Sequence, residues 1–98
     1  MKEGKIRIEY SEKLLKSLKR LPNKLIEKAY EKEKIFKENP LYPLLRTHKL
    51  HGKDKDCWAF WIDYKYRIKF RIKFIFLSDD EVLFLDIGPH NIYNILTN

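Results

Sequence analysis

The residues from His48 to Phe76 read HKLHGKDKDCWAFWIDYKYRIKFRIKFIF, and the second half of this stretch decides the fold. From Tyr66 to Phe76, bulky apolar residues alternate with cations almost without a break. Such a period of two, in aromatic and β-branched residues, is typical of a β-strand with one buried face. The set expected to face the core is Tyr66, Ile68, Phe70, Ile72, Phe74 and Phe76. The set expected on the other face is Arg67, Lys69, Arg71, Lys73 and Ile75.

Further strands are predicted on both sides of this one. A short strand around residues 48–51 and a turn rich in Gly, Asp and Lys precede a strand from Cys57 to Tyr64. Its alternation gives two sets: Trp58, Phe60 and Ile62 inward, and Ala59, Trp61 and Asp63 outward. A turn at residues 78–80 leads to a last strand from Glu81 to Ile87. The inward set expected there is Leu83, Leu85 and Ile87.

The first part of the chain predicts a strand followed by a helix. Lys5–Tyr10 alternates as the first strand, and Ser11 is a favourable N-cap for a helix. The apolar stripe of that helix runs from Leu14 to Leu21, and Pro22 interrupts it or begins the next helix.

A second amphipathic helix is predicted after Pro22. Its apolar face includes Leu25 and Phe36, and it should end near Asn39, because the residue before a proline disfavours helix. Neither helix can bury its stripe alone, so we expect a helical hairpin packed on a mostly antiparallel sheet. The fold class predicted is α+β.

Length and charge restrict the class of protein. The chain has 98 residues, which predicts a single domain over residues 1–98. A formal net charge of +7 favours an anionic partner such as nucleic acid or an acidic protein. One cysteine allows no disulfide within the chain, and no metal-binding cysteine cluster is present in the sequence. The absence of a long apolar run and of a signal peptide predicts a cytoplasmic protein with no membrane partner.

A set of short motifs in this order resembles the RelE/ParE toxin superfamily, and within it the RelE and YafQ-like branches. The motifs are Lys49-Leu50-x-Gly52, Trp58-x-Phe60-x-Ile62-Asp63-Tyr64, Tyr66-Arg67-Ile68 and Asp86-Ile87-Gly88-x-His90. The resemblance implies a helical hairpin on a curved sheet and the toxin of a type II toxin–antitoxin system. Many members cleave mRNA in the ribosomal A site without a metal or other cofactor. It also implies an antitoxin partner, which we expect to be acidic, partly disordered and encoded by a neighbouring gene.

The resemblance also suggests catalytic residues. Arg67 matches the arginine that contacts the scissile phosphate in RelE-type members. His90 lies where YafQ-like members have a histidine, and His48 matches a second histidine of that branch. Asp63 is the nearest candidate for the YafQ-type aspartate. Histidine suits proton transfer, and arginine suits the phosphate because its charge does not titrate away.

Two departures from the resemblance keep other functions open: the active-site lysines of RelE are absent, and the third histidine of the YafQ-like branch has no clear counterpart. Where RelE has active-site lysines, this chain has Ala59 and Trp61. The catalytic set is incomplete in this respect, so two alternatives stand beside a ribonuclease. One is a ParE-type toxin that inhibits DNA gyrase without being a nuclease, and the other is a degenerate member that binds its antitoxin alone.

Aromatic and cationic residues on the outward faces are the predicted RNA contacts. An indole on an open face is unfavourable without a partner, so Trp61 is expected to stack on a base or to be covered by protein. The predicted RNA-binding set is Trp61, Lys49, Lys69, Arg71, Lys73 and Tyr93. Of the cations in it, those that follow Arg67 are expected to bind phosphates without sequence preference. No metal ligand is predicted.

Overall fold

The computed structural model describes residues 5–65 and 68–89, with the backbone alone for residues 64, 65, 68 and 69. These residues form strand β1 (Arg7–Tyr10), helices α1 (Glu12–Leu18) and α2 (Asn23–Glu38), and strands β2 (His48–Lys49), β3 (Trp58–Lys65), β4 (Ile68–Ser78) and β5 (Glu81–Pro89). Two 3₁₀ turns, at Pro43–Leu45 and Gly52–Asp54, flank β2. The predicted order of strand, two helices and then strands is confirmed.

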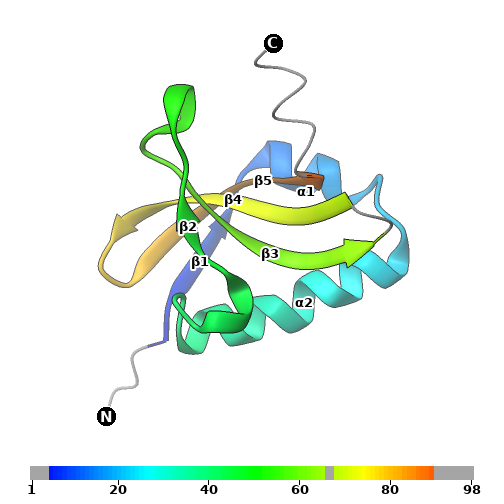
Figure 1. The fold of residues 1–98 in the computed structure, drawn as a ribbon, viewed down its shortest axis with the longest axis horizontal. Coiled ribbons are helices and arrows are strands. Elements are labelled where there is room, and N and C mark those ends of the chain that lie inside the picture. Colours follow the sequence, from blue (N-terminus) through cyan, green and yellow to red (C-terminus); the bar gives the residue numbers. More distant parts are fainter. Residues whose placement is uncertain (1–4, 66–67, 90–98) are drawn as a thin grey trace.

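The strands form a mixed sheet with a helical layer on one face (Figure 1). Its order is β1-β5-β4-β3-β2, and β1 lies parallel to β5 while the remaining neighbours are antiparallel. Helix α1 packs on β5 and α2 packs on β3. The α+β prediction is therefore confirmed. No helix in the described part of the chain is long and apolar enough to cross a membrane.

The core lies between the helices and the sheet, and Phe36 of α2 is at its centre. The Phe36 ring stacks on Phe60 of β3 at 4.7 Å between centroids and meets Phe74 and Phe84 edge-on at 4.9 and 5.5 Å. All four phenylalanines are 0–1 % exposed. Since these rings come from α2, β3, β4 and β5, aromatic contacts connect the two layers directly.

The predicted register of β4 is confirmed where side chains are described. Ile72 and Phe74 are buried in the core and Phe70 packs against it, whereas Arg71 and Lys73 belong to the other face. Phe76 keeps its place in the alternation and is 39 % exposed. Tyr66 and Arg67 lie outside the described residues.

The predicted register of β5 is wrong in its first half. Val82 and Phe84 are buried, while Leu83 and Leu85 are half-buried and alternate with them. Phe74 pairs with Phe84 and Lys73 pairs with Asp86, so a β-bulge leaves Leu85 without an opposite residue. The extra residue shifts the alternation by one, which lets Phe84 and Ile87 both face the core.

Ser11 connects α1 to the sheet. Its Oγ accepts a hydrogen bond from the Leu14 N–H at 3.0 Å and donates one to the Leu85 carbonyl at 2.7 Å. We expect Ser11→Ala to lower the free energy of unfolding by about 1–2 kcal/mol, because the cap and the bond to β5 are both lost. Urea unfolding measures this loss. Ser78→Ala is the control: Ser78 is the exposed last residue of β4, its hydroxyl donates to the exposed Asp80 carboxylate at 3.1 Å, and its loss should change stability by no more than about 0.5 kcal/mol. Equal midpoints for the two variants would contradict the role given to Ser11.

Candidate functional site

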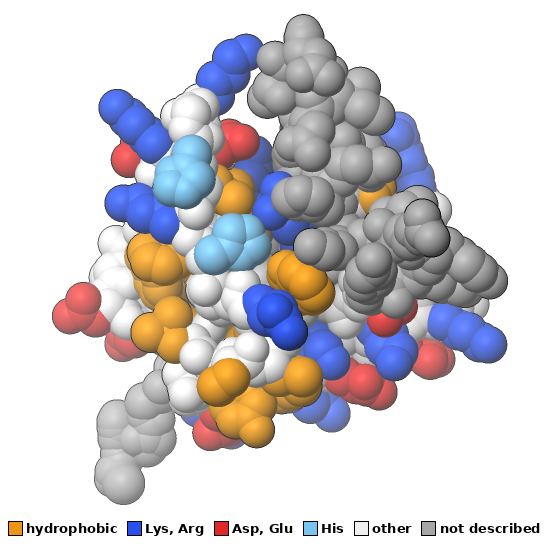
Figure 2. Space-filling view, viewed as in Figure 1, with side chains coloured by type: hydrophobic (Ala, Val, Ile, Leu, Met, Phe, Trp, Pro, Cys, Tyr) orange, Lys and Arg blue, Asp and Glu red, His pale blue; other side chains and the backbone are white. Residues whose placement is uncertain are grey.

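The candidate site lies on the face of the sheet away from the helices. Residues directly opposite one another on neighbouring strands point to the same face. Two such rows cross the sheet: His48, Ala59 and Lys73 form one, and Trp61, Arg71 and Gly88 form the other. The strands therefore bring together one catalytic candidate and three RNA-binding candidates from three separate stretches of sequence. Figure 2 shows the two described histidine side chains close together, with Lys and Arg side chains around them.

His48 makes two hydrogen bonds through its imidazole. Nδ1 lies 2.8 Å from the carbonyl oxygen of Arg46, and Nε2 lies 3.1 Å from Nη1 of Arg71. Arg71 is 5 % exposed, so its guanidinium is held within the sheet face. The structure thus pairs the predicted proton carrier with a buried cation.

Trp61 contacts a cation of the connecting loop. The Arg46 guanidinium carbon lies 4.9 Å from the centroid of the indole ring, within the range of a cation–π interaction. Trp61 is half-buried, so the ring is neither free in solvent nor part of the core. The chain itself supplies one partner for this indole.

Lys73 is held by an acidic residue of the turn before β3. Its Nζ lies 3.3 Å from Oδ1 of Asp54, and the two side chains are 17 % and 34 % exposed. Two cations predicted on this face, Arg71 and Lys73, are therefore held against the sheet by contacts within the protein. The most exposed described cation of the predicted set is Lys49, which lies on the edge strand β2.

Asp63 departs from the outward position predicted for it. The pairing of β3 with β4 shifts between Trp61 and Asp63, which sets Asp63 opposite Phe70 instead of Lys69. Phe70 packs against the core on the helix-facing side of the sheet. Because Asp63 pairs with Phe70 after the shift, its position in the register belongs to that side. The structure does not bring Asp63 into the two rows that hold His48 and Arg71.

Several predicted site residues are not placed by the structure. Arg67, His90 and Tyr93 lie outside the described residues, and so does the side chain of Lys69. The structure also places two residues in the candidate site that the sequence analysis missed, Arg46 and Asp54. Arg46 has a backbone φ of 51°, the left-handed region that is uncommon for a residue with a side chain. The bond from its carbonyl to His48 depends on this turn, and no sequence pattern marks it.

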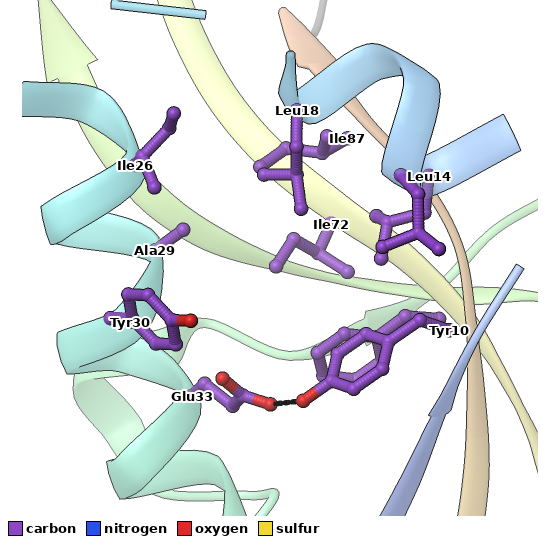
Figure 3. A pocket seen from close by; sticks show the side chains of 11 residues that line it. Tyr10, Leu14, Leu18, Ile26, Ala29, Tyr30, Glu33, Ile72 and Ile87 are labelled. Carbon is purple, nitrogen blue, oxygen red and sulfur yellow. Dashed lines mark hydrogen bonds between the residues drawn. The ribbon is translucent and has the colours of Figure 1, made fainter. Parts of the chain in front are cut away.

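A second feature is an apolar groove between α1, α2 and the sheet, about 200 Å³ in volume (Figure 3). At one end the Tyr10 hydroxyl donates a hydrogen bond to the buried Glu33 carboxylate. Burial, and then this hydrogen bond, raise the pKa of Tyr10, so the phenol stays protonated and keeps donating. Leu15 and Tyr30 on its rim are 47 % and 65 % exposed. Its lining is mostly apolar, which favours binding of a partner over chemistry.

Comparison of the sequence with protein-family models and with curated proteins finds no match. Solved structures do match. YafQ from Escherichia coli BL21(DE3) is 18% identical, with 90% of this chain and 97% of that chain covered and a TM-score of 0.70. The YoeB/ParE toxin from Agrobacterium tumefaciens is 15% identical, with 87% and 99% covered and a TM-score of 0.68. The RelBE2 toxin–antitoxin complex from Mycobacterium tuberculosis is 12% identical, with 88% and 99% covered and a TM-score of 0.70. The chain has the fold of the RelE/ParE toxins.

Proposed function

We propose that this chain is the toxin of a type II toxin–antitoxin system and acts as a metal-independent, ribosome-dependent mRNA endoribonuclease. The fold and the sequence motifs support the toxin assignment. The observation that carries the nuclease assignment is the bond between His48 Nε2 and Arg71 at 3.1 Å, on a sheet face that also holds Trp61 and Lys73. A proton carrier, cations and an aromatic ring are the groups that metal-free RNA cleavage and RNA binding require.

The reaction is an internal transfer at phosphorus. A base removes the proton of the ribose 2′-hydroxyl, the 2′-oxygen bonds to phosphorus, and the bond from phosphorus to the 5′-oxygen breaks. An acid returns a proton to the leaving 5′-oxygen. We assign His48 and His90 to the two proton steps, with the order open between them, and Arg67 to the charge that builds on the phosphate. Asp63 remains a further candidate for a proton step.

RNA binding is assigned to the aromatic and cationic residues around these groups. Trp61 and Tyr93 would stack on unpaired bases, as aromatic side chains commonly do. The phosphate contacts are assigned to Lys49, Lys69, Arg71 and Lys73. Because such contacts release counterions, binding should weaken steeply as salt is raised.

An acidic antitoxin is the proposed protein partner. The net charge of +7 favours an acidic segment, and a partly disordered chain can fold as it binds. The apolar groove between α1 and α2, with Leu15 and Tyr30 on its rim, offers a surface for such a segment (Figure 3). Co-expression of the neighbouring reading frame should restore growth, and the protein it encodes should co-purify with this chain. Failure on both counts would contradict the toxin–antitoxin assignment.

Induction in a bacterial host tests the proposed activity. The wild type should stop growth and cut transcripts within their translated regions. Arg67→Ala and His90→Ala should cut far less, and Arg67→Lys should restore cleavage in part, because lysine keeps the charge but loses the planar guanidinium. If transcripts stay intact while growth stops, the nuclease assignment fails.

One observation favours a non-enzymatic second candidate, a ParE-type inhibitor of DNA gyrase. RelE-type active-site lysines are replaced here by Ala59 and Trp61, and Ala59 is 0 % exposed. That position cannot present a cation to RNA. Growth arrest with intact transcripts, together with a loss of negative supercoiling in plasmid DNA, would support this candidate instead.

A further inference from the structure

We infer that Arg71 is a positioning residue that fixes which nitrogen of His48 carries the proton. The Arg46 carbonyl can accept a hydrogen bond but cannot donate one, so His48 Nδ1 must carry hydrogen to bond it at 2.8 Å. The Arg71 guanidinium can donate but cannot accept, so His48 Nε2 must present its lone pair to bond Nη1 at 3.1 Å. A neutral imidazole protonated on Nδ1 is the one state that satisfies both bonds.

The two partners of His48 are held by separate parts of the fold. Arg71 lies on β4, between β3 and β5, and is 5 % exposed, so its side chain has little freedom to turn away. Gly88, opposite Arg71 on β5, adds no side chain beside the guanidinium. On the other side, the left-handed turn at Arg46 directs its carbonyl toward His48. Hydrogen bonds at both ring nitrogens therefore fix the orientation of the imidazole.

Trp61 closes this arrangement into a ring of four residues. It lies opposite Arg71 in the pairing of β3 with β4, and its indole contacts the Arg46 guanidinium at 4.9 Å. Arg46 thus contacts His48 through its carbonyl and Trp61 through its side chain. A loop, β2, β3 and β4 each contribute one member, and the pairing of the sheet holds the three strands in place.

The consequence for catalysis rests on the proposed function. With Nδ1 bound to a carbonyl, Nε2 is the nitrogen through which His48 exchanges protons with substrate. Nε2 is engaged by Arg71 in the free protein, and a phosphate anion is the ligand that attracts a guanidinium more strongly than a neutral ring does. An RNA phosphate that binds Arg71 would then expose Nε2 in the correct tautomer. Arg71 would couple substrate binding to the availability of the proton carrier.

Nitrogen-15 NMR of the histidine rings tests the tautomer without any activity measurement. Spectra of ¹⁵N-histidine-labelled full-length protein are recorded as the pH is raised until the ring signals no longer change, so that they report neutral rings. His48 should show hydrogen on Nδ1 and a lone pair on Nε2, the reverse of the tautomer that a free imidazole prefers. The signal is assigned by its loss in His48→Ala, and exposed His51 serves as the internal reference. A wild-type His48 ring with hydrogen on Nε2 would overturn the inference before any variant is made.

Variants of Arg71 then test its role. Arg71→Met keeps much of the side-chain length but has no donor, so the His48 ring should move toward the tautomer with hydrogen on Nε2. Arg71→Lys keeps a donor and should retain part of the Nδ1–H population. Arg7→Met is the matched control, because it removes a cation that is 71 % exposed on edge strand β1. If Arg71→Met does not fold, Arg71→Lys and the wild-type spectrum still decide the question. An Arg71→Met or Arg71→Lys spectrum identical to that of the wild type would exclude the positioning role.

Kinetics separate this inference from the proposed function. Arg71→Met should lower kcat by up to about 10⁴-fold, the size seen when an orienting residue lets a catalytic histidine take the wrong tautomer. Arg71→Lys should recover part of this loss. If the wild type cleaves no RNA but the spectra behave as expected, the nuclease assignment fails while the positioning of His48 stands. If the wild type cleaves RNA and both Arg71 variants retain its kcat, the positioning role fails alone.

Discussion

Replacing His48 by alanine is expected to lower the rate of ribosome-bound mRNA cleavage by about 10²- to 10⁴-fold, the usual contribution of one general acid or base. The imidazole lies beside Arg71 on the sheet face that we assign to RNA, with Nε2 3.1 Å from the guanidinium. Alanine removes the group that moves the proton. Single-turnover cleavage by the purified variant, compared with the wild type, measures the effect.

His51→Ala is the matched control for this prediction. His51 is an exposed histidine just beyond β2, so its loss removes the same chemical group from a neighbouring position. It should leave the cleavage rate unchanged. His48 is half-buried on a short edge strand, and urea midpoints should show that both variants fold. If His48→Ala cleaves as fast as the wild type, His48 carries no proton and the proton steps fall to His90 and Asp63.

Phe36→Ala is expected to lower the free energy of unfolding by about 3–5 kcal/mol. Phe36 is 0 % exposed and contacts aromatic rings of β3, β4 and β5, so alanine leaves a cavity where the two layers meet. Domains of this size are stable by only about 5–15 kcal/mol, so the loss is a large share of the total. Urea unfolding followed by tryptophan fluorescence measures it.

Two comparisons keep the Phe36 prediction testable. Tyr30→Ala removes an aromatic ring from the same helix at a position that is 65 % exposed, and should cost much less. Phe36→Leu leaves a smaller cavity and should fold even if Phe36→Ala does not. Equal stabilities for Phe36→Ala and Tyr30→Ala would show that the helices do not pack on the sheet as described.

The order of the elements follows from local sequence. The period of two from Phe70 to Phe74, the N-cap at Ser11 and the helix end before Pro40 are each encoded by neighbouring residues. The structure places each of these features where the sequence predicts it. Local rules suffice here because periodicity and caps act over a few residues.

The register of β5 shows where local rules stop. Alternation predicts that Leu83 and Leu85 are buried in the core. Because of the bulge at Leu85, Val82 and Phe84 are buried there instead. A bulge inserts one unpaired residue in response to the neighbouring strand. The register also shifts between Trp61 and Asp63 in β3, and this shift moves Asp63 from the predicted outward side of the sheet to the helix-facing side.

The sequence proposes residues of the candidate site but none of their contacts, and it misses Arg46 and Asp54. The resemblance identifies His48, whereas its bond to Arg71 joins residues 23 positions apart and depends on the pairing of β2, β3 and β4. The carbonyl of Arg46 reaches His48 through a left-handed turn that the sequence does not signal. Contacts of this kind come from the assembled sheet, so residue type alone could not reveal them.

The most direct test of the proposed activity is cleavage of a defined mRNA by the purified protein, with and without ribosomes paused on a known codon. The account predicts cuts at the codon in the ribosomal A site, lost in His48→Ala and absent when ribosomes are left out. An mRNA that stays intact on ribosomes exposed to the wild-type protein would contradict the proposed activity.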